Sequence, residues 1–157
     1  MSDYICRLMQ QSELDEVAQL VKKAGDFAWS PLIIQQSFFS PNDNSFVLST
    51  MNVGAINESA VLGYAVIHTV LDESHLLNIV IKKQNQSKGL GTNFLKQLIN
   101  VVKQKNQKSL LLEVRSSNAK AIKLYEKFGF KRSGIRKAYY PIEKGREDAW
   151  LYSLSLD

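Results

Sequence analysis

The stretch that decides the fold is LLNIVIKKQNQSKGLGTNFLKQLINVVK, residues 76–103. Its first six residues are apolar on both faces, which is typical of a central strand that is covered on both sides. Beyond a short polar segment, apolar residues recur at helical spacing. We therefore expect a strand over residues 76–81 and a helix over residues 89–105, joined by a loop that contains two glycines.

A second strand and helix follow directly. SLLLEV, residues 109–114, predicts another buried strand, and residues 118–128 predict a helix that ends at Gly129. Two strands joined by one crossover helix run parallel and side by side. The centre of the chain therefore predicts a pair of parallel strands.

The remaining segments predict strands and helices around this centre. Ser12 can cap a first helix, with Asp15 in the capping-box position, and Ser30 before Pro31 marks the start of a second. The helices are expected over residues 13–23 and 31–39, and the strands over residues 4–8, 45–51, 60–70, 131–139 and 149–156. The last two strands are expected to be linked by a polar loop around EKGRED. The fold class is therefore α/β, with a mixed, mostly antiparallel sheet and about four helices in one domain, residues 1–157.

Composition limits the class of protein. A chain of 157 residues has the length of one globular domain. Cys6 is the only cysteine, so an internal disulfide is impossible, and a reducing, cytoplasmic location is expected. The first residues lack the pattern of a signal peptide, and the longest apolar run is too short to span a bilayer. No membrane partner is expected.

Charge is distributed unevenly along the chain. Residues 82–137 contain 15 lysines and arginines but only two acids, Glu113 and Glu126, whereas the rest of the chain is acidic. A basic segment of this kind suggests a polyanionic partner, either a phosphate-bearing cofactor or a nucleic acid. Two solvated, lysine-rich helices without such a partner would give the same excess of basic residues.

The loop QSKGLG, residues 86–91, lies between the central strand and its helix. The N-terminus of a helix presents free N–H groups and a partial positive charge, and glycine lets a phosphate approach the backbone closely. The order of residues is neither that of a Walker loop nor that of the dinucleotide fingerprint. The loop therefore predicts a phosphate site, although a simple helix start would need the same turn.

The Q-x-x-G-x-G pattern of this loop resembles the acetyl-CoA loop of the GNAT superfamily of N-acetyltransferases. Within that superfamily, LLLEVRSSNAKAIKLYEKFGF (residues 110–130) and YYPIEKGREDAW (residues 139–150) resemble the bacterial ribosomal-protein-alanine N-acetyltransferases. FAWS, residues 27–30, matches a short segment of the same family. The resemblance extends over about residues 75–150 and is specific in the late segments.

The resemblance implies how acetyl-CoA would bind. In this family two parallel strands splay apart and the pantetheine arm lies between them; here the strands would be those at residues 76–81 and 109–114. The backbone of Ile79, Val80 and Ile81 would pair with the pantetheine. The pyrophosphate would be held by Ser87, Lys88, Gly89, Leu90, Gly91 and Thr92, and Asn118 would contact the coenzyme. Acetyl-CoA is then the polyanionic partner of the basic segment.

Glu113 is the one acid in an apolar strand. Burial of a carboxylate is costly unless it is paired, so Glu113 is either part of an ion pair, for example with Arg115, or a functional group. An α-amino group has a pKa near about 8 and must lose a proton before it can attack a thioester, and a carboxylate can accept that proton. The resemblance implies that Glu113 is this general base.

Tyr125 lies on the helix after that strand, where Ile122, Tyr125 and Phe128 also make an ordinary core stripe. The resemblance implies that Tyr125 is the general acid that protonates the leaving thiolate. Asn118 is placed to cap the same helix, which is compatible with a contact to the coenzyme. The oxyanion donor is expected to be a backbone N–H near Val80 or Ile81.

For the acceptor, the resemblance implies Trp29, Tyr139 and Tyr140, together with the late loop around Arg146. The expected partner is a basic protein N-terminus, an N-terminal alanine of a small-subunit ribosomal protein, bound by a monomer or weak dimer. Lysine side chains, small amines and aminoacyl-tRNA are alternative acceptors, and a non-catalytic RNA-binding module is an alternative of another class. Direct nucleic-acid binding is not expected, because Phe94 is the only aromatic residue between Lys82 and Lys108. No metal site is expected, because no histidine or cysteine has metal-ligand spacing.

Overall fold

The structure is a computed structural model of the chain, and it describes residues 3–25, 27–50 and 61–157. In this part of the chain seven strands form one sheet in the order β1-β2-β3-β4-β5-β7-β6. They are β1 (Tyr4–Leu8), β2 (Asp43–Thr50), β3 (Val61–Val70), β4 (Glu73–Ile81), β5 (Ser109–Arg115), β6 (Lys131–Ile142) and β7 (Gly145–Ser155). Neighbouring strands are antiparallel except β4 and β5, which are parallel. The predicted mixed sheet with a central parallel pair is confirmed.

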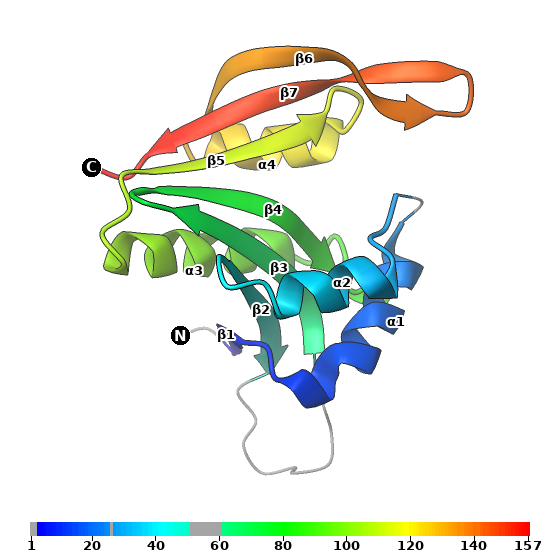
Figure 1. Cartoon of the computed structure of the whole chain (residues 1–157), viewed down its shortest axis with the longest axis vertical. Helices are drawn as coiled ribbons and strands as arrows, with labels where there is room; N and C mark the ends of the chain where they lie inside the picture. Colours follow the sequence, from blue (N-terminus) through cyan, green and yellow to red (C-terminus); the bar gives the residue numbers. More distant parts are fainter. Residues whose placement is uncertain (1–2, 26, 51–60) are drawn as a thin grey trace.

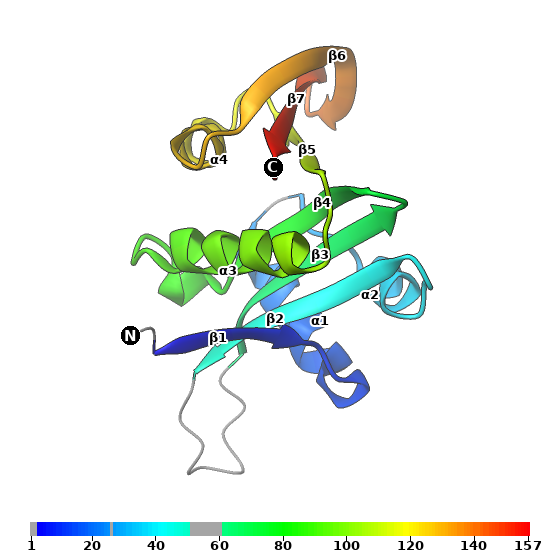
Figure 2. The same cartoon turned by 90° about the vertical axis from the view of Figure 1, so that its left-hand side faces the viewer.

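In the described residues, four α-helices cover the two faces of this sheet (Figure 1). They are α1 (Leu14–Ala24), α2 (Pro31–Phe38), α3 (Leu90–Gln104) and α4 (Ala119–Lys127). Helices α1 and α2 lie on one face, and α3 and α4 lie on the other, as the side view in Figure 2 shows. None of the helices in the described ranges is both long and apolar enough to pass through a bilayer.

Each face of the sheet has its own apolar core. Alternate residues of β2 and β3 point to opposite faces, so Val47 and Tyr64 pack with α1 and α2. Phe46, Ala65 and the apolar stripe of α3 form the other core, which continues to β5 and α4. Because both faces are covered, the central strands are apolar along most of their length.

The two parallel strands separate along their length, and this separation positions the site. Residues 73–76 of β4 pair with residues 109–112 of β5. Beyond that point β4 stays paired with β3 as far as Ile81, and β5 stays paired with β7 as far as Arg115. The second half of each strand has therefore lost the other as a partner, which confirms the predicted splay.

The start of the first helix differs from the prediction. The expected cap at Ser12, with Asp15 in the capping-box position, is wrong, because residues Gln11–Glu13 form a 3-10 turn and α1 begins at Leu14. The carboxylate of Glu13 accepts hydrogen bonds from the Gln10 N–H at 2.9 Å and from the Arg7 guanidinium at 2.9 and 2.7 Å. Arg7 belongs to β1, so a tertiary contact decided where the helix starts.

The late strands also differ from the prediction. The polar segment EKGRED is not a loop, because β6 continues to Ile142 and β7 begins at Gly145. The turn needs only two residues, and Gly145 takes a φ of 109° that favours glycine. Arg146, Glu147 and Asp148 therefore belong to β7. The loop expected after β2, together with Met51 and Ala60, lies outside the described residues.

Candidate active site

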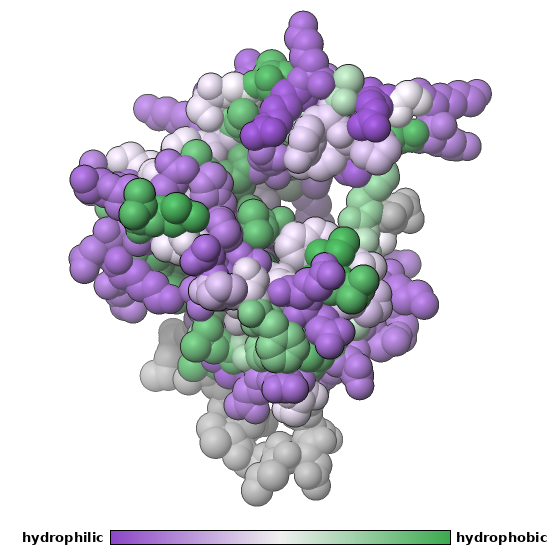
Figure 3. All heavy atoms as spheres, in the orientation of Figure 1, coloured by the Kyte–Doolittle hydropathy of each residue, from purple (hydrophilic) through white to green (hydrophobic). Residues whose placement is uncertain are grey.

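A cavity of about 710 Å³ opens where β4 and β5 separate. Its walls come from the end of β4, the end of β5, the loop before α3, α4 and the segment after α1. Figure 3 shows the surface hollowed between the part that contains β6 and β7 and the part that contains α1 and α2. This volume is in the range of small-molecule sites.

The N-terminus of α3 forms one wall. Gly89 is the N-cap with a φ of 81°, and Ser87 has a φ of 63°, so the loop turns sharply into the helix. The side-chain amide of Gln86 donates to the Ile81 carbonyl at 2.9 Å, which fixes the loop to the end of β4. The first N–H groups of a helix have no partner within it, and no acid is present in the first turn of α3. The wall is therefore suited to an anion.

Gly91 leaves open space along this wall. A Cβ atom built at Gly91 would meet only Leu124, at an ordinary distance of 3.8 Å. Its backbone has no positive φ, unlike that of Gly89. The protein itself therefore does not require glycine at position 91, whereas a ligand that approaches the backbone would.

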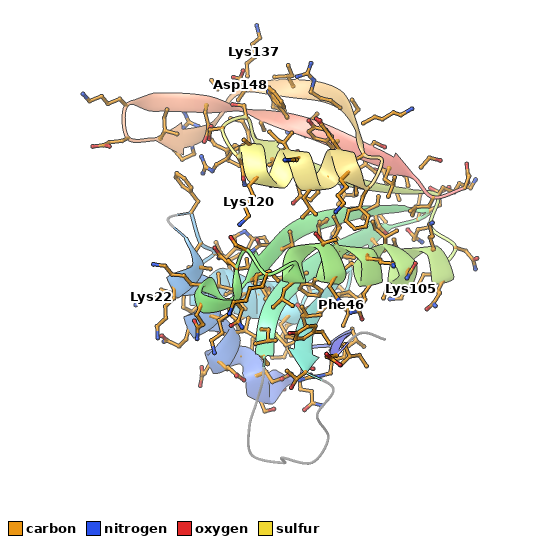
Figure 4. All side chains as sticks on the ribbon, turned by 180° about the vertical axis from the view of Figure 1, so that it is seen from behind. Lys22, Phe46, Lys105, Lys120, Lys137 and Asp148 are labelled. Carbon is orange, nitrogen blue, oxygen red and sulfur yellow. The ribbon has the colours of Figure 1, made fainter. Side chains whose placement is uncertain are left out.

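Helix α4 adds positive charge to the cavity. Lys120, Lys123 and Lys127 are spaced by three and four residues, so they share one face of the helix, and all three line the cavity. The Lys120 ammonium donates to the Ser87 hydroxyl at 3.0 Å, and Figure 4 shows it pointing from α4 towards the opposite wall. The cavity therefore has a cationic side next to the α3 N-terminus.

Glu113 lines the cavity from the other face of β5. Leu112 and Val114 point into the core beneath α4, so Glu113 points to the face on which α1 and α2 lie. The predicted burial is wrong: the Glu113 side chain is 33% exposed and pairs with Arg136 of β6, with Nε and Oε1 3.2 Å apart. Arg115 pairs with Glu147 instead. The cavity thus connects the two faces of the sheet through the gap between β4 and β5.

Tyr125 and Asn118 line the α4 side. Tyr125 is 6% exposed, and burial raises the pKa of its phenol to about 12. Its ring lies 5.7 Å from that of Phe130, so it also belongs to the core. The Asn118 side chain accepts from the Ala121 N–H at 3.2 Å, which confirms the predicted cap. Tyr125 therefore stays protonated at neutral pH.

On the Glu113 side of the cavity, Arg115 holds the walls together. Its guanidinium carbon lies 3.5 Å from the centroid of the Phe27 ring and 4.3 Å from that of Tyr140. Its Nη1 donates to Glu147 at 3.0 Å, and both side chains are mostly buried. Hydrogen bonds from Ser117 and then from Arg115 lower the pKa of the Glu147 carboxyl. The segment after α1 is thereby joined to β5 and to the late hairpin.

Most residues predicted from the sequence line this cavity. They are Glu113, Tyr125, Ile79, Val80, Ile81, Ser87, Gly89, Gly91, Thr92, Asn118 and Tyr140. Four others do not: Lys88 is exposed, Leu90 is buried in the core, Trp29 packs against the α1 and α2 core, and Tyr139 stacks edge-on against Tyr140 at 5.0 Å. In residues 3–25, 27–50 and 61–157, no group of three or more His, Cys, Asp or Glu side chains could hold a metal ion.

Several residues that line the cavity were not predicted from the sequence. The lysines of α4 have helical spacing, which could have placed them on one face pointing at the same loop. Phe27 and Arg115 gave no such signal, because they are 88 positions apart and meet only in the folded chain. Arg136 is outside the cavity lining, and its ion pair with Glu113 was not predicted either, since it reaches Glu113 across β7.

Comparison with known proteins agrees with this geometry. Residues 12–130 match the model of the acetyltransferase (GNAT) family. The [ribosomal protein bS18]-alanine N-acetyltransferase of Salmonella typhimurium is 33% identical over 149 residues, which cover 95% of each chain. The crystal structure of the ribosomal-protein-S18-alanine N-acetyltransferase from Escherichia coli superposes with a TM-score of 0.87 at 31% identity, covering 98% of this chain and 94% of that one.

A more distant structure supports the fold alone. Spermidine N-acetyltransferase from Vibrio cholerae, in complex with CoA and spermine, has a TM-score of 0.82 at 16% identity, covering 99% of this chain and 97% of that one. The family match spans well over half of the chain, and the similarity to the Salmonella enzyme spans nearly all of it. The chain therefore belongs to the acetyltransferase (GNAT) family and is an acyltransferase, as its sequence predicted.

Proposed function

We propose that this protein transfers the acetyl group of acetyl-CoA to the N-terminal alanine of a small-subunit ribosomal protein. The observation behind the proposal is the cavity at the splayed strands, which has a cationic wall on one face of the sheet and a carboxylate on the other. The acceptor is taken from the relatives named for ribosomal protein bS18, one of which matches nearly the whole chain.

The cationic wall fits the coenzyme. The α3 N-terminus and the lysines of α4 present N–H groups and ammonium groups to a pyrophosphate, and Gly91 leaves the space that it needs. The half of β4 that no longer pairs with β5 leaves one edge of residues 79–81 open, so the pantetheine arm could pair with it as an added strand. When bound, acetyl-CoA supplies an acetyl thioester as the electrophile.

The proposed reaction uses groups from both faces of the sheet. Glu113 accepts a proton from the acceptor's α-ammonium, directly or through a water, and the freed amine attacks the thioester carbonyl. A backbone N–H of Val80 or Ile81 donates a hydrogen bond to the oxygen that becomes negative. The C–S bond then breaks, and Tyr125 donates its phenolic proton to the sulfur that leaves. The raised pKa of Tyr125 keeps that proton in place until a thiolate forms. The nitrogen loses its second proton to water, and the phenolate regains a proton from water.

The test uses acetyl-CoA and a short basic peptide that begins with alanine. A matched peptide with the same lysines and a blocked N-terminus is the control, and fragment mass spectrometry locates the acetyl group. Acetylation of the α-amine of the first peptide alone would support the proposal. Acetylation of lysine in both peptides would keep the enzyme class and reject the N-terminal acceptor. No transfer despite coenzyme binding would reject a peptide acceptor.

A further inference from the structure

Arg136 is the partner of the carboxylate on which the proposed chemistry depends. Its Nε lies 3.2 Å from Oε1 of Glu113, and its side chain is 55% exposed. The two residues belong to β6 and β5, which are separated in the sheet by β7. The ion pair therefore crosses a whole strand to reach Glu113.

The strand register shows which residues lie between Arg136 and Glu113, namely Leu151 and the small Ala149 of β7. The register aligns Glu113 with Leu151 and Leu151 with Gly134, and it aligns Arg115 with Ala149 and Ala149 with Arg136. Directly opposed residues share one face of a sheet. On that face Ala149 presents only a methyl group, and Gly134 has no side chain. The Arg136 side chain can therefore lie across β7 towards the cavity.

A bulge follows Arg136 directly. Arg136 pairs with Ala149 and Tyr140 with Glu147, so residues 137–139 face Asp148 alone. The Ala138 N–H donates to the Asp148 carboxylate at 2.9 Å, and Ala138 has a φ of 50°. Figure 4 shows Lys137 of this bulge pointing away from the molecule, with Asp148 beside it. Arg136 is therefore the last residue of β6 before the bulge that keeps the regular alternation, two positions from Gly134 and on the same face.

The acceptor must bring a second cation to the same carboxylate. At neutral pH an α-amino group is largely protonated, and it must approach Glu113 to lose its proton. The Arg136 guanidinium pairs with one of the two Glu113 oxygens, so an incoming ammonium competes with it for the same negative charge. The guanidinium can move aside, because an exposed ion pair is weak enough to open.

We propose that Arg136 is a positioning residue that occupies the place of the acceptor's ammonium until the acceptor displaces it. This inference rests on the proposed function. The displaced guanidinium has a second position nearby, because the Tyr139 ring centroid is already 5.4 Å from the guanidinium carbon. Arg115 does not move in this way, because Glu147 and two aromatic rings hold it. Arg136 thus orients the Glu113 carboxylate in the free enzyme and competes with the acceptor.

The test compares Arg136→Met with Arg132→Met. Arg132 is on the same strand but stacks over Trp150, so its loss removes the same charge without touching the cavity. Removal of the competitor is expected to lower the KM for the alanine peptide by about two- to fivefold, the range of an exposed ion pair, with little change in kcat. Arg136→Lys should return KM towards the wild-type value.

A binding measurement distinguishes competition from a change in groove shape. With coenzyme A present, Arg136→Met should bind the free peptide more tightly and the N-terminally acetylated peptide as the wild type does, since only the first has an ammonium. Equal changes for both peptides, or an unchanged or higher KM, would overturn the inference while the proposed function stands. If the wild-type enzyme acetylates no N-terminal amine, the proposed function fails and the inference fails with it.

Discussion

The guanidinium of Arg115 stacks on the ring of Phe27 at 3.5 Å, and this contact joins the segment after α1 to the splayed strand β5. The same guanidinium contacts Tyr140 of the late hairpin on its way to Glu147. Three parts of the chain that are far apart in sequence thereby form one side of the cavity. The width of the cavity on the Glu113 face depends on these contacts.

Phe27→Ala is expected to destabilise the protein by about 0.5–1 kcal/mol, the contribution of a cation–π contact near the surface. It should raise the KM for the acceptor more than it changes kcat, because it alters the wall and leaves Glu113 in place. Denaturant unfolding and steady-state kinetics measure the two effects. Leu32→Ala, also exposed and apolar but outside the cavity lining, is the control. Equal effects of both changes on KM would contradict the assignment.

Glu113→Gln is expected to lower kcat by about 10²–10⁴-fold, the usual contribution of a general base. Coenzyme binding should be unchanged, since Glu113 lies on the face away from the lysines. Calorimetric titration with coenzyme A and single-turnover kinetics separate the two steps. Glu126→Gln removes the other acid of the basic segment, from the exposed side of α4, and should have near wild-type activity. A Glu113→Gln enzyme with normal kcat would exclude it as the base.

Tyr125→Phe is expected to lower kcat by about 10–100-fold, less than the loss of the base, because a thiol with a pKa near about 8.5 already leaves readily as the thiolate. With its pKa raised to about 12, Tyr125 stays protonated to about pH 10, so activity should not fall on its account below that pH. A loss of activity at alkaline pH below 10 that is absent in Tyr125→Phe would contradict this expectation.

The raised pKa of Tyr125 also makes the stability of the protein depend on pH. Folded Tyr125 holds its proton more tightly than the unfolded chain does, so its contribution is complete below about pH 10. The contribution is lost as the pH rises from about 10 to 12. The melting temperature of Tyr125→Phe should therefore fall less steeply than that of the wild type over this range.

Gly91→Ala is expected to weaken coenzyme binding without weakening the fold. The helix should keep or gain stability, by up to about 1 kcal/mol, because alanine is the better helix former and its Cβ would meet only Leu124 at 3.8 Å. Coenzyme affinity should fall by about 10–100-fold, the value of a hydrogen bond to a charged group. Gln104→Ala, at the exposed end of the same helix, is the control. Unchanged affinity would show that a phosphate does not approach this turn.

Glu147→Gln is expected to make the stability of the protein fall less steeply as the pH is lowered. Hydrogen bonds from Ser117 and Arg115 lower the pKa of the folded carboxyl, so its contribution is present above the unfolded value near about 4.3 and is lost as the pH falls below it. Melting curves between pH 6 and 3 measure this slope. Glu143→Gln, exposed at the turn of the same hairpin, should keep the wild-type slope.

The central unit of the fold can be predicted from local patterns in the sequence. Apolar runs at residues 76–81 and 109–114, each followed by a helical pattern, predict two parallel strands because one crossover helix allows only that arrangement. The two glycines at the start of the first of these helical patterns also predict an anion site, which stays a prediction. Gly89, Gly91 and Asn118 line the cavity as expected because their geometry is set by neighbours in the chain.

Only the tertiary structure decided which charges meet. Glu113 was expected to be buried, with Arg115 as one candidate partner, but its side chain is 33% exposed and Arg136 reaches it across β7. Arg115 found Glu147 because EKGRED continues a hairpin and does not form a loop. The start of α1 likewise depends on Arg7 of β1. Local pattern sets which elements form, whereas partners from distant strands depend on register and bulges, which a single sequence does not encode locally.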